Sequence, residues 1–338
     1  MKKTIAIILA AAILMLCGTA TAFAGGSKSS FGAYEHVFII GIDGAGAAFS
    51  LCDTPNFDRI FADNAYRYDA ITEYVTVSAQ NWGSILTGVD YETHGFNNDN
   101  TGKNQRGSDS PNNSIFYYTR QAYPEAKLVS FCHWKNINHG IIENDIHVHK
   151  VNRATDALVT ESITHYFKSG KVPKLMFVQL DNADHAAHTY GGYSDQYYKA
   201  IEELDVYLGE IYDAIDAQGL MDNSLFVVVA DHGENESGHG GQSKDESSAF
   251  VAVAGHSVNH KILNKGVRNR DVAAIALYAL GIERPAHFSA RVPSDLFGVS
   301  REKTVAPNPM ETKKRVERAF PYFFIGMANR IADPFDKR

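Results

Sequence analysis

Residues 36–43 read HVFIIGID, an unbroken apolar run that stops at the carboxylate of Asp43. A continuous run of this kind, without alternation of apolar and polar residues, is typical of a strand buried on both faces of a parallel sheet. Helical patterns separate this run from later ones, and the clearest lies at 197–217. Further apolar runs of the same character lie at 127–132, 174–181 and 224–231. Strands that alternate with helices predict an α/β fold, a three-layer α/β/α sandwich around a mostly parallel sheet.

Carboxylates and imidazoles stand where three of these strands end. Asp43 closes the first run, and residues 181–188, DNADHAAH, follow the third. Asp231 and His232 close the fourth and lead to His239 in a glycine-rich turn. Ligands of such sheets bind beyond the carboxyl ends of the strands. Imidazole nitrogen and carboxylate oxygen are the ligands of zinc-type ions. The sequence therefore predicts a site for two divalent metal ions, expected to be zinc, at this edge of the sheet.

The residues alone leave the register of the second stretch open. Asp184 and His188 are four residues apart and would share one face of a helix, but Asp181 and His185 have the same spacing. The adjacent pair of the fourth run raises a different question, because neighbouring residues of a regular strand point to opposite faces. They can bind one metal only if the strand has ended, and Gly233 makes such a turn inexpensive.

A candidate nucleophile lies in residues 75–88, VTVSAQNWGSILTG, as Ser78. A serine hydroxyl is a weak nucleophile at neutral pH, so a metal would have to stabilise its alkoxide while a second metal stabilises the leaving oxygen. We expect Asn81 to hold a non-bridging phosphoryl oxygen, and a helix-capping or turn role is the alternative. Thr76 and Ser84 are the alternative hydroxyls.

The charges of this site favour one class of substrate. Two divalent cations and three aspartates leave about +1, and the Ser78 alkoxide brings the site to about zero. No arginine lies nearby in the sequence to clamp a second negative charge. These features predict a phosphodiester in preference to a dianionic monoester.

Composition restricts the remaining possibilities. The chain has 338 residues and 44% apolar residues, enough for one large α/β domain or two small ones. A formal charge of -7 argues against a nucleic-acid polymer as partner, because that needs a basic face. Thr54 and Pro55 are expected to open a short helix that runs to Phe61. The polar, Gly/Asn-rich residues 97–113 are expected to form a loop near the mouth of the site.

The two ends carry different signals. Residues 1–24 have two lysines, an apolar run and an A-x-A end, which predicts a cleaved signal peptide and export to the periplasm, the cell surface or the medium. An uncleaved anchor is the alternative, although the run is shorter than the roughly 18–20 residues of a membrane span. Residues 25–35 are expected to be a linker, 36–300 the catalytic domain and 301–338 a basic, aromatic tail. That tail either packs on the domain or touches an anionic membrane peripherally.

Export would permit a disulfide between Cys52 and Cys132, and two free buried thiols are the alternative.

Together these motifs resemble the alkaline phosphatase superfamily, and most of all its nucleotide pyrophosphatase/phosphodiesterase branch. The resemblance covers residues 37–297. It rests on Asp43 at a strand end, TPNFDRI at 54–60, Ser78 with Asn81 and Thr87-Gly88, the D-x-x-x-H-x-x-G run at 184–191, and the D-H-G and H-G-G-x-S runs at 231–233 and 239–243. One departure is Gln80, where the family has proline.

The resemblance implies a ligand set and settles the register in favour of Asp184 and His188. It implies that one metal takes Asp184, His188 and His239, and that the other takes Asp43, Asp231, His232 and Ser78. The implied activity is hydrolysis of phosphodiester or pyrophosphate bonds in a small-molecule substrate. Alternatives are a phosphoethanolamine-type transferase, a phosphomonoesterase or phosphonate hydrolase, and an inactive binding protein. No Cys-x-Pro-Ser-Arg motif of a formylglycine sulfatase is present.

Overall fold

The computed structural model describes residues 30–264 and 266–298. The expected signal peptide at 1–24 and the tail at 301–338 lie outside the described residues, as does the first part of the 25–35 linker. These assignments therefore stay predictions. Within the described part of the chain, no helix is long and apolar enough to cross a membrane.

An eight-stranded sheet forms the middle layer, in the order β4-β3-β5-β1-β6-β7-β2-β8. The central strand β1 (His36–Ile42) pairs in parallel with β5 (Leu175–Leu180) and with β6 (Ser224–Ala230). Strand β3 (Leu128–Cys132) extends the parallel part beyond β5. All four strands expected from apolar runs are therefore confirmed, and they are neighbours in one sheet, as a mostly parallel α/β fold requires.

Four further strands complete the sheet and were not predicted. They are β2 (Ala65–Ile71), β4 (His149–Asn152), β7 (Ser248–Ala254) and β8 (Lys261–Ile262). Strand β7 runs antiparallel to both of its neighbours, β6 and β2. The sequence of β2, AYRYDAI, is not recognisable as a buried strand because it contains charged residues. Arg67 is nevertheless buried, and its guanidinium lies 2.6 Å from the Asp69 carboxylate.

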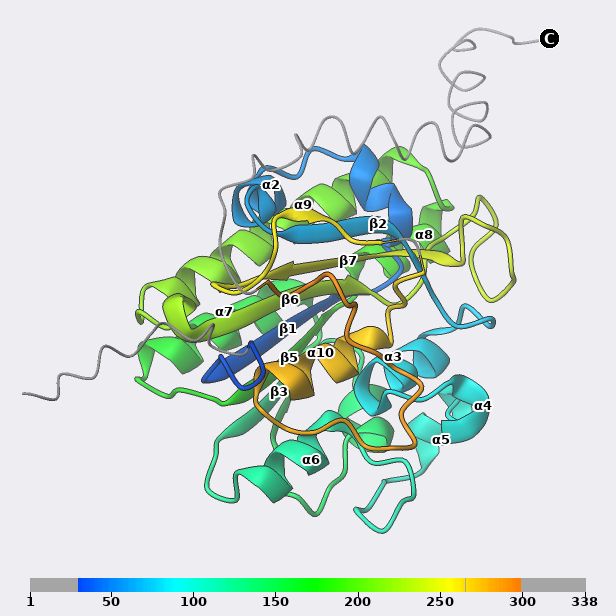
Figure 1. The fold of residues 1–338 in the computed structure, drawn as a ribbon. Helices are drawn as coiled ribbons and strands as arrows, with labels where there is room; N and C mark the ends of the chain where they lie inside the picture. The colour runs from blue at the N-terminus through cyan, green and yellow to red at the C-terminus, as the bar shows by residue number, and fades with distance from the viewer. Residues whose placement is uncertain (1–29, 265, 299–338) are drawn as a thin grey trace, which may run out of the picture.

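Helices cover both faces of the sheet and make the outer layers (Figure 1). One face carries α2 (Pro55–Phe61), α7 (Asp156–Lys168), α8 (Asn182–Tyr190) and α9 (Asp195–Asp216). The other carries α3 (Ser78–Thr87), α6 (Ile115–Ala122) and α10 (Asp271–Ala279). Strand β1 contributes side chains to both hydrophobic cores, since Phe38 and Ile40 pack in one cluster and Val37 and Ile39 in the other. The three-layer α/β/α architecture is thus confirmed.

Helix α9 shows how the apolar pattern becomes packing. Its expected stripe is fully buried along its whole length, at Ile201, Leu204, Leu208, Ile211 and Ile215. Burying each such side chain contributes about 1.5–3 kcal/mol relative to exposure. The stripe therefore fixes α9 against the sheet.

The 97–113 segment differs from the expected loop. It begins with a short helix, α5 (Asn98–Lys103), preceded by α4 (Tyr91–His94). The side chains of Asn97 and Asn100 each accept a hydrogen bond from the other's backbone N–H, at 2.8 and 3.0 Å. Asparagine clusters signal turns, but this reciprocal pairing is a capping box that starts a helix.

Other local expectations can be compared directly. Helix α2 begins with Pro55 after Thr54, as predicted, although the Thr54 side chain makes no capping hydrogen bond. Cys52 and Cys132 are both buried and do not form a disulfide with each other, which is the two-thiol alternative. The described residues also include 3-10 helices at Gly46–Leu51 and Met221–Asn223 and a short π-helix at Ile137–Ile141.

Candidate metal centre

Two neighbouring parallel strands deliver the first group of ligands. Asp43 follows β1, and Asp231 and His232 follow β6, so all three lie at the same edge of the sheet. The Nε2 atom of His232 lies 3.5 Å from Oδ1 of Asp43 and 3.3 Å from Oδ2 of Asp231. All three side chains are buried. The strand has ended at Ala230, so the adjacent residues Asp231 and His232 converge, as the Gly233 turn suggested.

The second group comes from α8 and the glycine-rich turn. The Nε2 atom of His239 lies 3.3 Å from Oδ1 of Asp184 and 3.0 Å from Nε2 of His188. His188 Nε2 in turn lies 3.5 Å from Oδ2 of Asp184. The structure therefore brings together the pair that the family resemblance favoured. His185 is exposed, and Asp181 instead accepts a 2.7 Å hydrogen bond from the Gln179 amide.

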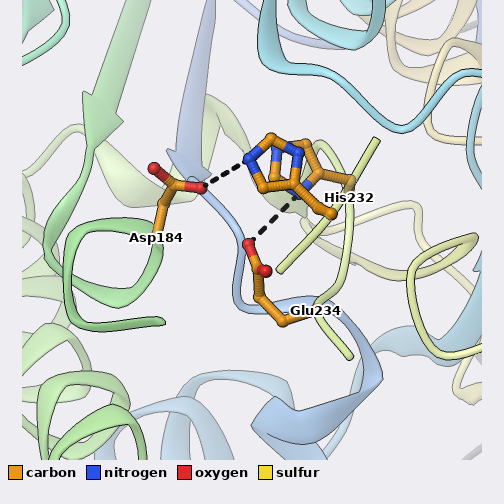
Figure 2. Close-up of side chains that lie close together, drawn as sticks. Asp184, His232 and Glu234 are labelled. Carbon is orange, nitrogen blue, oxygen red and sulfur yellow. Dashed lines mark ion pairs between the residues drawn. The ribbon is translucent and has the colours of Figure 1, made fainter. Parts of the chain in front are cut away.

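The two groups meet at a pair of stacked imidazoles. The rings of His232 and His239 have centroids 3.9 Å apart and planes only 17° apart. Figure 2 shows Asp184 and Glu234 on two sides of His232. Across the described residues, two sets of side chains could hold a metal ion: Asp43, Asp231 and His232, and Asp184, His232, Glu234 and His239.

These groups fit divalent metals of the zinc type. Zinc binds imidazole nitrogen and carboxylate oxygen at about 2.0–2.1 Å, so tetrahedral ligand atoms stand about 3.3 Å apart. The separations of 3.0–3.5 Å within both groups match that edge. One oxygen each of Asp43, Asp184 and Asp231 is buried without a hydrogen-bond partner in the described structure. Buried polar atoms are normally satisfied, and an ion at each group would satisfy them.

Burial shapes the protonation of this cluster. Burial, together with the neighbouring carboxylates, raises the pKa of Asp43 and of Asp231 well above the usual value. Burial, with His239 beside it, lowers the pKa of His232 to about 3, so this imidazole is neutral and able to ligate. Burial opposes protonation of His239 as well, but the neighbouring Asp184 carboxylate, 3.3 Å from its Nε2 atom, raises the pKa of His239 to about 9. The carboxylates thus favour a positive charge among them.

Ser78 lies at the first group of ligands. It is the first residue of α3, and its Oγ lies 3.4 Å from Nε2 of His232. The alternative hydroxyls are engaged elsewhere. Thr76 donates to the carbonyl of Gly241 at 3.0 Å, and Ser84 pairs with the His94 ring at 3.1 Å.

Asn81 does not point into the cluster, which corrects the expected direct contact with a phosphoryl oxygen. Both hydrogens of its fully buried amide are used, in bonds of 3.1 Å to the carbonyls of Val75 and Val77. Its oxygen accepts from the backbone N–H of Glu73 at 2.8 Å and from Asn269 at 3.1 Å. The structure therefore gives Asn81 the alternative role, in which it holds the turn before Ser78.

A different amide stands beside Ser78. Asn98, exposed at the start of α5, accepts a 3.1 Å hydrogen bond from the backbone N–H of Ala79. Sequence reasoning placed this residue near the mouth of the site without giving it a role. The available signal was the asparagine cluster at 97–100.

Sequence reasoning also missed four residues that contact the ligands or the segments that carry them: Trp82, Gln179, Asp156 and Glu234. Asp43 accepts hydrogen bonds from Trp82 and Gln179, at 2.8 and 2.9 Å. Asp156 is fully buried and accepts from the first backbone N–H groups of the α8 turn. Glu234 lies inside the second group of ligands. Burial is the first cause that raises the pKa of Glu234, to about 9.

Known proteins identify the family of this chain. Residues 37–303 match the family described as type I phosphodiesterase / nucleotide pyrophosphatase. The chain belongs to this family. Its fold and motifs place the protein in the alkaline phosphatase superfamily, as expected from the sequence.

Relatives of this family member share limited identity with it. A GPI ethanolamine phosphate transferase 1 of Emericella nidulans is 28% identical over 189 residues, which is 45% of this chain and 20% of that protein. A 2,3-bisphosphoglycerate-independent phosphoglycerate mutase of Rhodopirellula baltica is 30% identical over 139 residues, 39% of this chain and 24% of that protein. The chain thus spans no more than about a quarter of these curated relatives.

Solved structures share the fold at low identity. An inactive murine ectonucleotide pyrophosphatase/phosphodiesterase 5 in complex with AMP has a TM-score of 0.59 and 12% identity, with 75% of this chain and 96% of that chain covered. A lipoteichoic acid synthase of Listeria monocytogenes has a TM-score of 0.58 and 13% identity, with 83% and 77% covered. At such identities these likenesses support the fold alone.

Proposed function

We propose that this phosphodiesterase family member is an exported hydrolase of phosphodiester or pyrophosphate bonds that uses two zinc ions and Ser78 as nucleophile. One observation carries the proposal. The Ser78 hydroxyl and two carboxylates surround Nε2 of His232 at 3.3–3.5 Å, the spacing of ligands around one zinc ion.

Each ion would have its own residues. Asp43, Asp231, His232 and Ser78 would hold one, and Asp184, His188 and His239 would hold the other. When bound, the pair of ions would stabilise the Ser78 alkoxide and the charge on the leaving oxygen.

The chain's own groups would carry the remaining steps. Ser78 Oγ would form a bond to phosphorus while the alcohol or phosphate leaving group departs with the electrons of the broken bond. The start of α3 would present backbone dipoles to the phosphoryl oxygens. The Asn98 side chain, held beside Ser78 through the Ala79 N–H, would supply the neutral donor first expected of Asn81. Water would then cleave the phosphoseryl intermediate and restore the hydroxyl.

A singly charged diester suits this arrangement. Arg270, which reaches Glu73 in the turn before Ser78, forms ion pairs with Glu73 at 3.1 Å and with Asp90 at 3.8 Å. It is therefore engaged with two carboxylates and not directed to a dianionic phosphate. This supports a small-molecule diester, and a nucleic-acid polymer is not expected as partner.

A second candidate is transfer of a phosphoethanolamine-like group to an acceptor hydroxyl. The observation in its favour is that several relatives are GPI ethanolamine phosphate transferases. The same phosphoseryl intermediate would then react with a sugar or lipid hydroxyl in place of water. Product analysis with and without an acceptor alcohol separates the two.

The decisive experiment combines metal analysis with a substrate screen. Purified protein should carry about two equivalents of metal, lose activity on chelation and regain it with zinc. It should turn over bis-p-nitrophenyl phosphate with a higher kcat/KM than p-nitrophenyl phosphate, and a phosphonate ester extends the comparison. Full activity in a metal-free preparation would overturn the proposal, and a wide preference for the monoester would replace it with a phosphatase.

Export rests on residues 1–24 and has a separate test. N-terminal sequencing of protein recovered outside the cytoplasm should begin near Gly25. An intact Met1 on that protein would favour an uncleaved anchor.

A further inference from the structure

Glu234 is a buried carboxylate at the second group of ligands. It follows the D-H-G turn and is 1% exposed. Neither of its oxygens has a hydrogen-bond partner within the described residues. Figure 2 shows the side chain directed toward His232, with Oε1 3.8 Å from Nδ1 of that ring. The ionised form of such a carboxyl group loses its hydration without gaining a hydrogen-bond donor, which is costly unless a cation lies beside it.

The neighbours of Glu234 make this cost larger. One ligand atom each of Asp184, His232, Glu234 and His239 lies within 4.8 Å of the others. Glu234 and Asp184 also lie against the same glycine, because a Cβ at Gly44 would lie 2.9 Å from the Asp184 Cβ and 3.1 Å from Oε1 of Glu234. Among the ion pairs of the described chain, Glu234 has no lysine or arginine partner. Two ionised carboxylates at this separation, of which that of Glu234 is fully buried, favour a positive charge between them.

We infer that Glu234 is a further ligand of the metal ion held by Asp184, His188 and His239. The inference rests on the proposed two-metal function and adds a fourth carboxylate to it. The charge of the metal-loaded site before reaction falls from about +1 to about zero. A neutral site repels a second negative charge on the substrate more than a cationic one does, so Glu234 also selects singly charged esters over dianionic ones.

Metal affinity measured by competition with a chromophoric chelator tests the inference without using activity. Glu234→Gln should bind one of its two zinc ions at least 10- to 100-fold more weakly, because the amide keeps an oxygen but loses the charge. Cobalt substitution adds a spectroscopic signature, since the visible absorption of the weakened ion should change with its ligands. The matched control is Glu236→Gln, an exposed glutamate of the same loop, which should bind both ions as the wild type does.

Stability of the metal-free protein provides a second readout. If Glu234 serves the ion, the metal-free Glu234→Gln variant should unfold at about the same temperature as metal-free wild type, because the amide keeps the shape of the side chain and no hydrogen-bond donor of the described residues loses its acceptor. Zinc should then raise its unfolding temperature less than it raises that of the wild type. The diester-to-monoester ratio of kcat/KM should also fall.

The outcomes distinguish this inference from the function on which it rests. Wild-type affinity for both ions in Glu234→Gln, with a less stable metal-free variant, would overturn the ligand role and show a structural one. Wild-type protein that binds no metal would overturn the proposed function itself.

Discussion

The indole nitrogen of Trp82 donates a 2.8 Å hydrogen bond to Oδ2 of Asp43, and both side chains are buried. Trp82 lies one turn after Ser78 on α3, so this bond ties the nucleophile's helix to the end of β1. Gln179 donates to the same oxygen at 2.9 Å, which leaves Oδ1 facing the His232 ring. Gly41 makes room for the indole, because a Cβ at that position would collide with its ring. The two oxygens of Asp43 are thus divided between the protein and the proposed ion.

Replacing Trp82 by phenylalanine tests this division. The variant loses a hydrogen bond to a charged group and part of a buried ring, so the free energy of unfolding should fall by about 2–4 kcal/mol. Metal affinity should fall about 10- to 100-fold, because Asp43 is no longer oriented. Urea unfolding and chelator competition measure the two effects. Trp134→Phe is the control, since the link of Trp134 to Gln179 uses its backbone N–H and survives the change. Unchanged metal affinity in Trp82→Phe would show that this bond does not position Asp43.

Ser78→Ala separates chemistry from metal binding. Removing the hydroxyl should lower kcat by several orders of magnitude, because the covalent route is lost. The ions should remain, since their carboxylate and imidazole ligands are untouched, and metal analysis of the purified variant checks this. Ser84→Ala, which alters a hydroxyl paired with His94, should keep most of the activity. Wild-type rates in Ser78→Ala would move the nucleophile to Thr76, despite the bond of that hydroxyl to Gly241.

The two asparagines should behave differently. Asn98→Ala should lower kcat about 10- to 1000-fold, as expected for one lost donor to transition-state charge, with little change in stability. Asn81→Ala breaks buried hydrogen bonds to the turn before Ser78, so it should lower the free energy of unfolding by about 1–3 kcal/mol. Kinetics and denaturant unfolding of both variants measure this. The assignment reverses if Asn81→Ala is fully stable and Asn98→Ala fully active.

The parts of the fold marked by uninterrupted apolar runs were predictable. The four central strands follow from continuous apolar runs and the α9 stripe from helical periodicity, because burial on both faces or on one face leaves a direct trace in the sequence. Strand β7 was not predicted. It begins at Ser248, straight after the loop that carries His239, and its run SAFVAVA contains small residues of weak strand preference. Its place between β6 and β2 is a tertiary relationship that no local pattern records.

The site divides in the same way. Asp43, Asp231 and His232 could be found because they end apolar runs, and strand ends of a parallel sheet meet at one edge. Glu234 is only two residues from His232, yet its part in the cluster depends on its proximity to Asp184, which lies on α8 after strand β5. Asn81 stood in a plausible motif position, and only the path of the 73–77 turn showed where its amide is used. Position at the end of an apolar run thus identified the ligands, but not the residues that hold those ligands in place.

Asp156 is one of those supports, and its removal should have a pH-dependent cost. Its fully buried carboxylate accepts hydrogen bonds from the backbone N–H groups of Asp181 and Asn182, at 2.9 and 2.7 Å, and so holds the start of the helix that carries Asp184. It also accepts a 2.8 Å bond from Nδ1 of His133, and this bond raises the pKa of His133 above its ordinary 6.5. Asp156→Asn should therefore lower the free energy of unfolding by about 1–3 kcal/mol.

A raised histidine pKa contributes stability that is fully present below 6.5 and is lost as the pH rises through the folded-state pKa. The difference between wild type and Asp156→Asn should consequently be larger near about pH 6 than near about pH 9. Urea unfolding of chelated protein at both pH values measures it, and titrations common to the two proteins cancel in the difference. In a His133→Gln background the pH dependence of that difference should disappear while the cost of the lost backbone bonds remains. A difference that stays constant with pH in the presence of His133 would show that the Asp156 carboxylate acts only on the α8 backbone.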